Sequence, residues 1–301
     1  MHIFIPYTER GAYALDTFML FQFLPPELAG RIQETGIAPE NIREIRLRAE
    51  APPVIVAEKN YVLDDMTLSS CLLQRTAGRM CQNSVYARQE ELKNGFVTLP
   101  GGHRAGFCGR TVLENGQIRS LTEISSINLR VAHEIIGAAD PVVPALVHGR
   151  DIYNTLIISP PACGKTTLLR DIARQLGGTA YGFRVGIADE RGELAAMHRG
   201  VPGCDVGIFT DVYDGCPKAQ AMQMLLRGMS PQVVITDELG GEEDEAAVRA
   251  LTYAGVRVIC SLHGGSREDA LARPGIGALM RAGIFRKTVV LSGVGQILSI
   301  S

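Results

Sequence analysis

The chain has 301 residues, of which 46% are hydrophobic and 21% are charged. This length fits two domains of ordinary size, and the composition is that of a soluble globular protein. The formal net charge of -2 excludes an overall positive field that would attract nucleic acid or acidic lipid, while leaving room for a local basic patch.

Cysteine usage and hydropathy favour a cytoplasmic protein. The seven cysteines are spread along the chain without a CxxC pair, which predicts buried free thiols rather than disulfides or a zinc site. No run of roughly 18 apolar residues is available to cross a bilayer. Residues 1–23 are interrupted by Glu9, Arg10 and Asp16 and lack the regions of a signal peptide. We expect membrane contact only through a partner.

Residues 24–133 have the pattern of a small α+β domain, and residues 1–23 before it are left unassigned. Pro25-Pro26-Glu27 is a typical helix start and Gly36 a typical stop. A second helix is predicted from 72 to about 86. Asn115-Gly116 is the strongest hairpin signal in the chain. Strands are predicted at 43–47, 53–57, 96–99, 103–108, 111–114, 117–119 and 126–131.

The second half of the chain has a different pattern. Residues 134–150, with Pro141 and Pro144, are predicted to form a linker with short helices. From residue 151 to 301, apolar runs alternate with amphipathic helices, which indicates an α/β fold with a mainly parallel sheet covered on both faces. The predicted strands are 155–158, 185–188, 233–236, 256–261 and 287–291, and a helix at 165–176 follows the first of them.

The segment 159–167 lies between a predicted strand and a predicted helix and ends like a Walker A motif, or P-loop. In such a loop, backbone N–H groups and the helix dipole converge on a phosphate. We expect Lys165 to bind the β- and γ-phosphates of ATP and the Thr166 hydroxyl to bind Mg²⁺. The predicted ATP-binding residues of the loop are Ser159, Pro160, Pro161, Ala162, Cys163, Gly164, Lys165, Thr166 and Thr167.

Two questions about this loop stay open at the level of sequence. The same residues could form a turn that carries a surface lysine and binds no phosphate. In addition, Ser159 stands where the first glycine of the motif usually lies. If that position needs a positive φ, serine would cost about 1 kcal/mol there.

Carboxylates follow the predicted strand at 233–236. Asp237 and Glu238 come directly after this apolar run, and burying such a pair is costly unless it meets a cation. We therefore expect Asp237 or Glu238 to hold Mg²⁺ through water. The alternative is an exposed strand end with solvated acids.

A second acidic segment, Asp189-Glu190-Arg191, follows the predicted strand at 185–188. Glu190 could act as the general base that activates the attacking water, and Asp189 is a further candidate metal ligand. A local ion pair among the three residues is the alternative. His263 follows another apolar strand and could contact the γ-phosphate, although a lone histidine is more often structural.

These motifs together resemble a known family. The Walker A segment, Asp189-Glu190-Arg191, the segment from Pro231 to Glu238 and His263 occur in the order found in secretion ATPases of the type II and type IV systems. There they are called the Walker A, Asp box, Walker B and His box. The segments 44–48 and 126–130 resemble the N-terminal domain of these enzymes. Within the family, the segments 83–92, 99–104 and 188–193 resemble the stage III sporulation AA branch.

The resemblance implies a RecA-like P-loop ATPase that uses ATP and Mg²⁺, with nucleotide between its two domains and subunits in a hexameric ring. It implies that Glu190 is the catalytic glutamate and that Glu238 is the Walker B glutamate. It also suggests that Arg104 and Arg130 reach the nucleotide, unless they simply face solvent. The partners implied are inner-membrane components of a stage III sporulation channel between mother cell and forespore.

Two other functions are set against this motor. A nucleotide-gated assembly scaffold with negligible hydrolysis is favoured by Ser159 and by Gln232, which stands where many secretion ATPases have aspartate. A nucleic-acid motor is disfavoured, because the chain is slightly acidic and lacks aromatic residues interleaved with basic ones.

Overall fold

The computed structural model describes residues 21–81, 92, 95–114, 116–132, 134–197, 200–293 and 295–301. The chain divides into two compact units, Met1–His133 with Met197–Gly203, and Glu134–Ala196 with Cys204–Ser301. The domain boundaries predicted from the sequence stay a prediction. Among the described residues, none of the helices combines the length and apolar character needed to cross a membrane.

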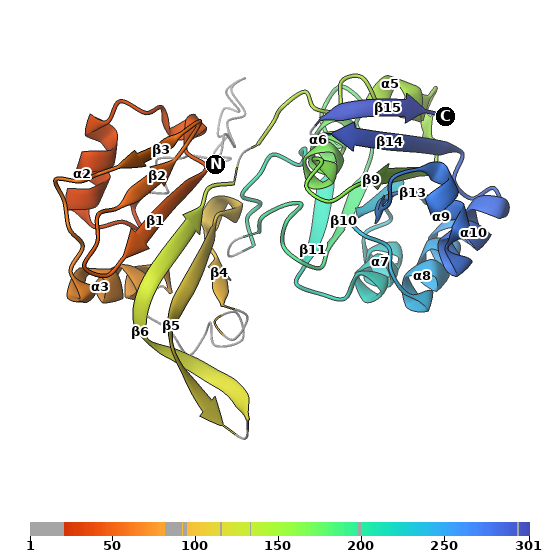
Figure 1. Cartoon of the computed structure of the whole chain (residues 1–301). Helices are drawn as coiled ribbons and strands as arrows, with labels where there is room; N and C mark the ends of the chain where they lie inside the picture. Colours follow the sequence, from red (N-terminus) through yellow and green to blue (C-terminus); the bar gives the residue numbers. More distant parts are fainter. Residues whose placement is uncertain are drawn as a thin grey trace, which may run out of the picture. The chain divides into compact units, whose positions relative to one another are not determined.

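The first unit is an α+β structure built on a six-stranded antiparallel sheet, in the order β3-β2-β1-β6-β5-β4 (Figure 1). In β1 the alternation predicted from the sequence places Ile45 and Leu47 in the core. The described elements of this unit are α2 (Pro26–Glu34), η1 (Pro39–Asn41), β1 (Glu44–Arg48), β2 (Val54–Val56), β3 (Asn60–Val62), α3 (Ser70–Met80), β4 (Phe96–Thr98), η3 (Pro100–Gly102), β5 (Arg104–Glu114) and β6 (Gln117–Arg130).

Most of the elements predicted in the first half are present, with three differences. Helix α3 begins earlier than predicted, because Ser69 caps it by accepting a hydrogen bond from Leu72 N (3.2 Å). The predicted helix end near residue 86, the segment 83–92 except residue 92, and Asn115 lie outside the described residues. The short strands predicted around residues 103–131 are joined into the two long strands β5 and β6.

The second unit contains a seven-stranded sheet in the order β11-β10-β12-β13-β9-β14-β15, parallel except for β15. This confirms the predicted α/β class. The elements are α5 (Val143–Leu146), β7 (Val147–His148), β8 (Asp151–Ile152), β9 (Thr155–Ser159), α6 (Lys165–Leu176), β10 (Val185–Asp189), β11 (Thr210–Asp214), α7 (Lys218–Gly228), β12 (Val233–Thr236), α8 (Glu242–Tyr253), β13 (Arg257–His263), α9 (Arg267–Ala272), α10 (Pro274–Arg281), β14 (Lys287–Gly293) and β15 (Gln296–Ile300).

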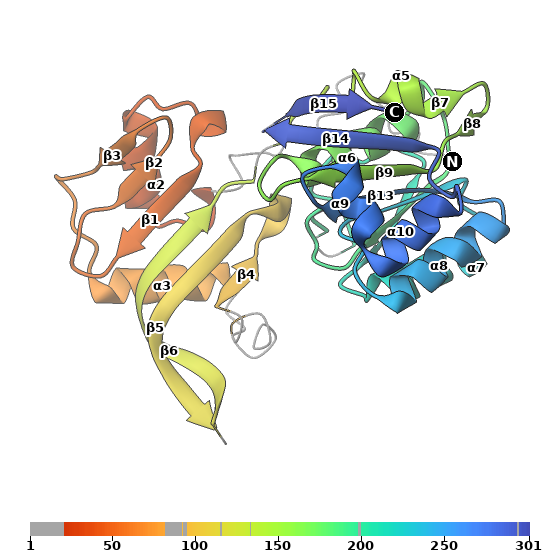
Figure 2. The ribbon, with the colours of Figure 1, turned by 45° about the vertical axis from the view of Figure 1, so that its right-hand side comes forward.

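Helices cover both faces of this sheet (Figures 1 and 2). Leu156 and Ile158 of β9 share a core with α7, α8, α9 and α10, whereas α6 lies on the other face. Every residue of β9, β10 and β12 is buried, as expected for central parallel strands. Strands β7, β8, β11 and β15 are not predicted from the sequence, because they are short or half-exposed.

The register of the central strands brings their carboxyl ends to one edge of the sheet. Ser159 pairs with His263, and Thr236 pairs with both Ala188 and Cys260. The loops that follow β9, β10, β12 and β13 therefore meet at one place, where open α/β sheets usually bind ligands.

One composition-based prediction is wrong. All seven cysteines are free, but only Cys81, Cys204 and Cys260 are buried, and Cys71 and Cys108 are exposed. The spacing of cysteines excludes a disulfide framework, but it carries no information on burial.

Candidate functional site

The loop between β9 and α6 takes its shape from two left-handed residues. Ala162 has φ 58° and Gly164 has φ 91°. Ser159 is instead the buried last residue of extended β9, and its hydroxyl donates a hydrogen bond to Pro160 O (2.8 Å). Ser159 therefore does not have the positive φ that would have made serine costly at this position. The residue that carries the strain is Ala162, since a side chain in this region costs about 1 kcal/mol.

The amino end of α6 is open to an anion. Gly164 is its N-cap and has no side chain that could accept a hydrogen bond from the first turn. The N–H groups of this turn, at the positive end of the helix dipole, are therefore available to an anion. Lys165 is 7% exposed, which contradicts the alternative of a turn with a surface lysine. Burial lowers the pKa of Lys165, and Glu238 is foremost among the neighbouring groups that oppose this shift.

The C-terminal hairpin supports the loop from the side. Gly295, between β14 and β15, donates a backbone hydrogen bond to Cys163 O (3.3 Å). A Cβ placed on Gly164 would lie 3.6 Å from Gly295 N, an ordinary contact, so Gly164 is required by its φ and not by lack of space. No sequence signal indicated this support.

A chain of charged contacts connects Lys165 to the end of β12. Lys165 Nζ lies 3.0 Å from His263 Nδ1, and His263 Nε2 lies 2.5 Å from Glu238 Oε1. The second oxygen of Glu238 lies 2.8 Å from Arg191 Nη1. The imidazole ring of His263 thus lies between the Lys165 ammonium and the Glu238 carboxylate. The predicted candidates Lys165, Glu238 and His263 are thus brought together.

Glu238 has an unusual backbone conformation, with φ 35°. Its N–H donates a hydrogen bond to Ser261 Oγ (3.0 Å), and its carbonyl oxygen accepts one from Lys218 Nζ (2.8 Å). Burial would raise the pKa of Glu238, but Arg191 and His263 outweigh it, and the pKa is lowered. Glu238 is therefore held as a carboxylate, and strain of this kind is concentrated at functional sites.

Asp237 has the properties expected of a carboxylate that meets a cation. It is 3% exposed, which contradicts the alternative of solvated acids at a strand end. Its Oδ1 makes no hydrogen bond within the described part of the chain, and the ammonium of Lys218 lies 4.0 Å away. Burial raises the pKa of Asp237, and Lys218 is the main group that opposes the shift.

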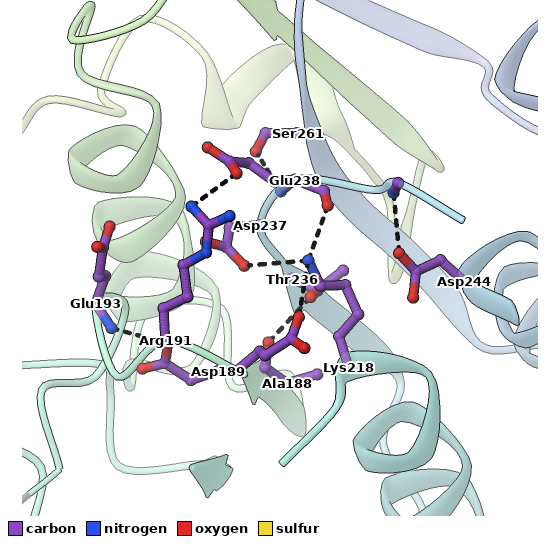
Figure 3. Close-up of polar contacts among 12 residues, drawn as sticks. Ala188, Asp189, Arg191, Glu193, Lys218, Thr236, Asp237, Glu238, Asp244 and Ser261 are labelled. Atoms are coloured by element: carbon purple, nitrogen blue, oxygen red, sulfur yellow. Dashed lines mark hydrogen bonds and ion pairs between the residues drawn. The ribbon is translucent and has the colours of Figure 1, made fainter. Parts of the chain in front are cut away.

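Asp189 is held by backbone donors, and its role as a metal ligand stays a prediction. Its Oδ1 accepts a hydrogen bond from Glu193 N at 2.9 Å (Figure 3). Its Oδ2 accepts hydrogen bonds from Leu194 N (3.0 Å) and Ala195 N (2.9 Å). Because backbone donors use both oxygens, the geometry assigns Asp189 to shaping the turn after β10. The sequence could not show this, since the donors follow in an irregular segment.

Glu190 faces a cation that the sequence analysis missed. Lys218, the first residue of α7, lies 3.2 Å from Glu190 Oε2. Arg191 pairs with Glu238, so the local ion pair considered for Asp189-Glu190-Arg191 is wrong. Only the place of Lys218 directly after Pro217, a residue type common at helix starts, could have drawn notice. A cavity of about 390 Å³ is lined by Glu190, Lys218, Glu238 and His263, among others.

Gln232 lies away from this cluster, at the other end of β12. Its Oε1 accepts a hydrogen bond from Arg184 N (3.0 Å). Many secretion ATPases have an aspartate at the position of Gln232. Because this position precedes β12, the change to glutamine does not alter the carboxylates that follow the strand. Neither sequence departure disturbs the cluster.

Arg104 and Arg130 belong to the first unit, on neighbouring strands. They are register partners in β5 and β6, and the guanidinium of Arg104 lies 4.8 Å from the centre of the Phe96 ring. Arg130 is 3.8 Å from Glu44, which faces it from β1. Their contact with nucleotide stays a prediction.

The fold and the arrangement of this edge place the chain in a class. The structure is similar to the ATPase DotB of Legionella pneumophila, with a TM-score of 0.59 and 17% identity over 89% of this chain and 76% of that one. It is equally similar to the pilus retraction motor PilT with bound ADP, with a TM-score of 0.59 and 17% identity over 86% and 76%. At this identity the likeness shows the fold, that of RecA-like secretion ATPases with an N-terminal domain.

The family within this class follows from the sequence itself. The family described as sporulation stage III, protein AA, matches residues 19–300. Stage III sporulation protein AA of Bacillus subtilis (strain 168) is 40% identical over 255 residues, which cover 83% of this chain and 82% of that protein. The chain therefore belongs to the stage III sporulation protein AA family, as the resemblance predicted.

Proposed function

We propose that this sporulation protein is an ATPase that binds Mg-ATP at the loop 160–164 and hydrolyses it at the carboxyl edge of the second unit's sheet. One observation carries the proposal. The buried Lys165, at the uncapped start of α6, shares this edge with two strand-end carboxylates, Asp237 and Glu238. A cation beside a helix N-terminus suits phosphate, and carboxylates nearby suit a metal ion and water.

The space beside α6 supports a nucleotide over a simple phosphate. A cavity of about 360 Å³ adjoins Gly164 and Thr167, so it begins where the phosphates would end. The described residues of its walls carry no charged side chain and suit the flat apolar faces of a base. The remaining lining residues are Ile135, Gly137, Ala138, Pro141, Leu168, Leu291, Gly295 and Ile297.

The residues present also fit Mg²⁺. Magnesium is usually held by one or two protein ligands together with phosphate oxygens and water. Thr166 would hold it through its hydroxyl, and Asp237, whose buried Oδ1 makes no hydrogen bond to a described residue, would hold it through water. When bound, the ion would neutralise charge on the transferring phosphoryl group.

The proposed roles of the remaining residues follow from their contacts. Both oxygens of Glu238 are engaged, by His263 and Arg191. Glu190 is 40% exposed and has one ion-pair partner among the residues that the structure describes, Lys218. This favours Glu190 as the general base that takes a proton from water. Glu238 and His263 would respond to the phosphate, because Lys165 must leave His263 to reach it.

In the cell, we propose that the ATPase works as a hexameric ring at the cytoplasmic side of the inner membrane. It would power or gate a channel complex of stage III sporulation, which it reaches through inner-membrane partners. Residues 151–301 would form the ATPase domain, and Arg104 and Arg130 would contribute positive charge from the N-terminal domain. Family membership and the secretion-ATPase fold support this proposal.

The Lys165→Ala variant tests the proposal. It removes the only side-chain cation proposed at the loop, so we expect phosphate release to fall to background and fluorescent ATP-analogue binding to weaken at least tenfold. Lys59→Ala, at an exposed lysine of the first unit, is the control and should retain both. Unchanged phosphate release in a folded Lys165→Ala protein would refute the proposed site.

A nucleotide-gated scaffold with negligible hydrolysis is the second candidate. It is favoured by the contacts of Lys165 and Glu238, which hold both groups away from a phosphate. Phosphate release separates the two functions. We expect Glu190→Gln to reduce release by about 10²-fold or more while binding persists, and Glu238→Gln to affect both. Binding without release in the unaltered protein would instead establish the scaffold.

A further inference from the structure

Lys218 is a buried cation outside the motifs that define the site. It opens α7, and its side chain is 8% exposed. An ammonium group taken out of water is costly unless oxygens surround it. This lysine therefore needs its partners, and the described partners all belong to the candidate site.

Three oxygens surround the Lys218 ammonium. The carbonyl oxygen of Glu238 lies at 2.8 Å, Glu190 Oε2 at 3.2 Å and Asp237 Oδ1 at 4.0 Å (Figure 3). They come from the ends of two neighbouring strands, β10 and β12, whereas Lys218 comes from α7. One cation thus joins the carboxylate of Glu190 to the backbone and side chains at the end of β12.

Glu190 depends on this contact for its place. Its side chain is 40% exposed, and Lys218 is its ion-pair partner among the described residues. Without the ammonium, Glu190 would be a third carboxylate near Asp237 and Glu238. Negative charges gathered at one site repel one another. A half-exposed glutamate with no partner would turn toward solvent.

We propose that Lys218 is a positioning residue, whose ammonium group holds Glu190 against the end of β12 in the geometry that water activation needs. The inference rests on the proposed ATPase function and adds to it a residue outside the Walker A, acidic and histidine segments. Lys218 acts through Glu190 and the β12 end, and nucleotide binding at the loop 160–164 does not require it.

The test compares Lys218→Met and Lys218→Arg with Arg227→Met, which removes a positive charge from an exposed position of the same helix. We expect Lys218→Met to lower kcat about 10²-fold, the effect of a misplacement of about 1 Å, with the Kd of a fluorescent ATP analogue changed less than about threefold. Lys218→Arg should restore part of kcat, and Arg227→Met should match the unaltered protein.

A second readout needs neither nucleotide nor activity. In the ligand-free protein, hydrogen exchange at 237–241 should be faster in Lys218→Met than in Arg227→Met, because the Glu238 carbonyl loses its donor. A double variant isolates the route of the effect. In the Glu190→Gln background, adding Lys218→Arg should lower kcat no further, because both substitutions disturb the same ion pair between Lys218 and Glu190.

The outcomes separate the two proposals. If the unaltered protein hydrolyses ATP and Lys218→Met retains its kcat, or if kcat and binding fall together, the positioning role is overturned and the ATPase stands. If the unaltered protein binds no Mg-ATP, the ATPase itself is refuted, and the role of Lys218 falls with it. If Lys218→Met does not fold, the double-mutant cycle of Lys218→Arg and Glu190→Gln is the test. Losses of kcat that multiply in the double variant would overturn the proposal.

Discussion

Two residues of the candidate site hold backbone conformations that usually belong to glycine, although both carry side chains. Ala162 has φ 58° in the loop before α6, and Glu238 has φ 35° after β12. Each costs of order 1 kcal/mol, so the surrounding contacts must fix them. Glu238 is fixed by Ser261 and Lys218, at its N–H and carbonyl. Both positions lie at the proposed phosphate edge, where the backbone has to turn sharply.

The left-handed backbone at Ala162 leads to a prediction. A β-branched side chain fits this conformation poorly, so Ala162→Val should distort the loop and weaken ATP-analogue binding by about tenfold. Ala162→Gly should bind at least as well as the unaltered protein. Titration with a fluorescent ATP analogue checks both.

Ala246→Val, on the exposed side of α8, is the control for the extra methyl groups. It should leave binding unchanged. Equal binding by Ala162→Val and the unaltered protein would show that the loop backbone does not contact the phosphates.

At the scale of elements, the far end of the sheet is fixed by a pair of charges. Asp151 of β8 accepts two hydrogen bonds from Arg257, the first residue of β13, at 2.9 Å from Nε and 2.5 Å from Nη2. This fork-shaped pair fixes the start of the strand whose other end carries His263. The hydrogen bonds from Arg257 lower the pKa of Asp151 to about 2.

The lowered pKa of Asp151 gives stability a defined pH dependence. Because the folded-state pKa lies below the ordinary value of 3.8, the pair stabilises the protein above about pH 4, and this contribution is lost as the pH falls toward 2. Asp151→Asn should lower the free energy of unfolding by about 1 kcal/mol at pH 7, since the pair is partly exposed. The difference in the free energy of unfolding between Asp151→Asn and the unaltered protein should be smaller at pH 3.

Urea denaturation at the two pH values measures this effect. Asp211→Asn, on the edge strand β11, is the matched control, because Asp211 makes no hydrogen bond or ion pair within the described ranges. A constant difference between Asp151→Asn and the unaltered protein across pH would contradict the linkage.

At the scale of the whole molecule, the proposed motor requires assembly. In the proposed motor, ATP would replace the contacts that Lys165 and Glu238 make within one chain, and such a change can be passed to neighbouring subunits in a ring. We predict that sedimentation velocity with Mg²⁺ and a non-hydrolysable ATP analogue gives a species of about six chains.

The Lys165→Ala variant is the control for assembly, since it should not respond to nucleotide. A protein that sediments as one chain with and without the analogue would contradict the ring. It would not refute the proposed phosphate site, because Lys165, Glu238 and His263 meet within one chain.

The sequence alone determined five strands of the second unit's sheet and the residues at their ends. Continuous apolar runs predicted β9, β10, β12, β13 and β14, because a strand buried on both faces must be apolar throughout. The Gly-Lys-Thr segment and the acids after β10 and β12 are local patterns too. Their position at strand ends was enough to predict that they meet at one edge.

Only the tertiary structure decided which side chains pair at that edge. Lys165 meets His263 across 98 residues, Lys218 meets Glu190 from another helix, and Asp189 accepts hydrogen bonds from the backbone that follows it. The hairpin β14–β15 supports the loop, and Ala162 takes the strain expected of Ser159. These outcomes depend on strand order and on three-dimensional distance, because Coulomb attraction and hydrogen bonding act between neighbours in space, which local periodicity does not specify.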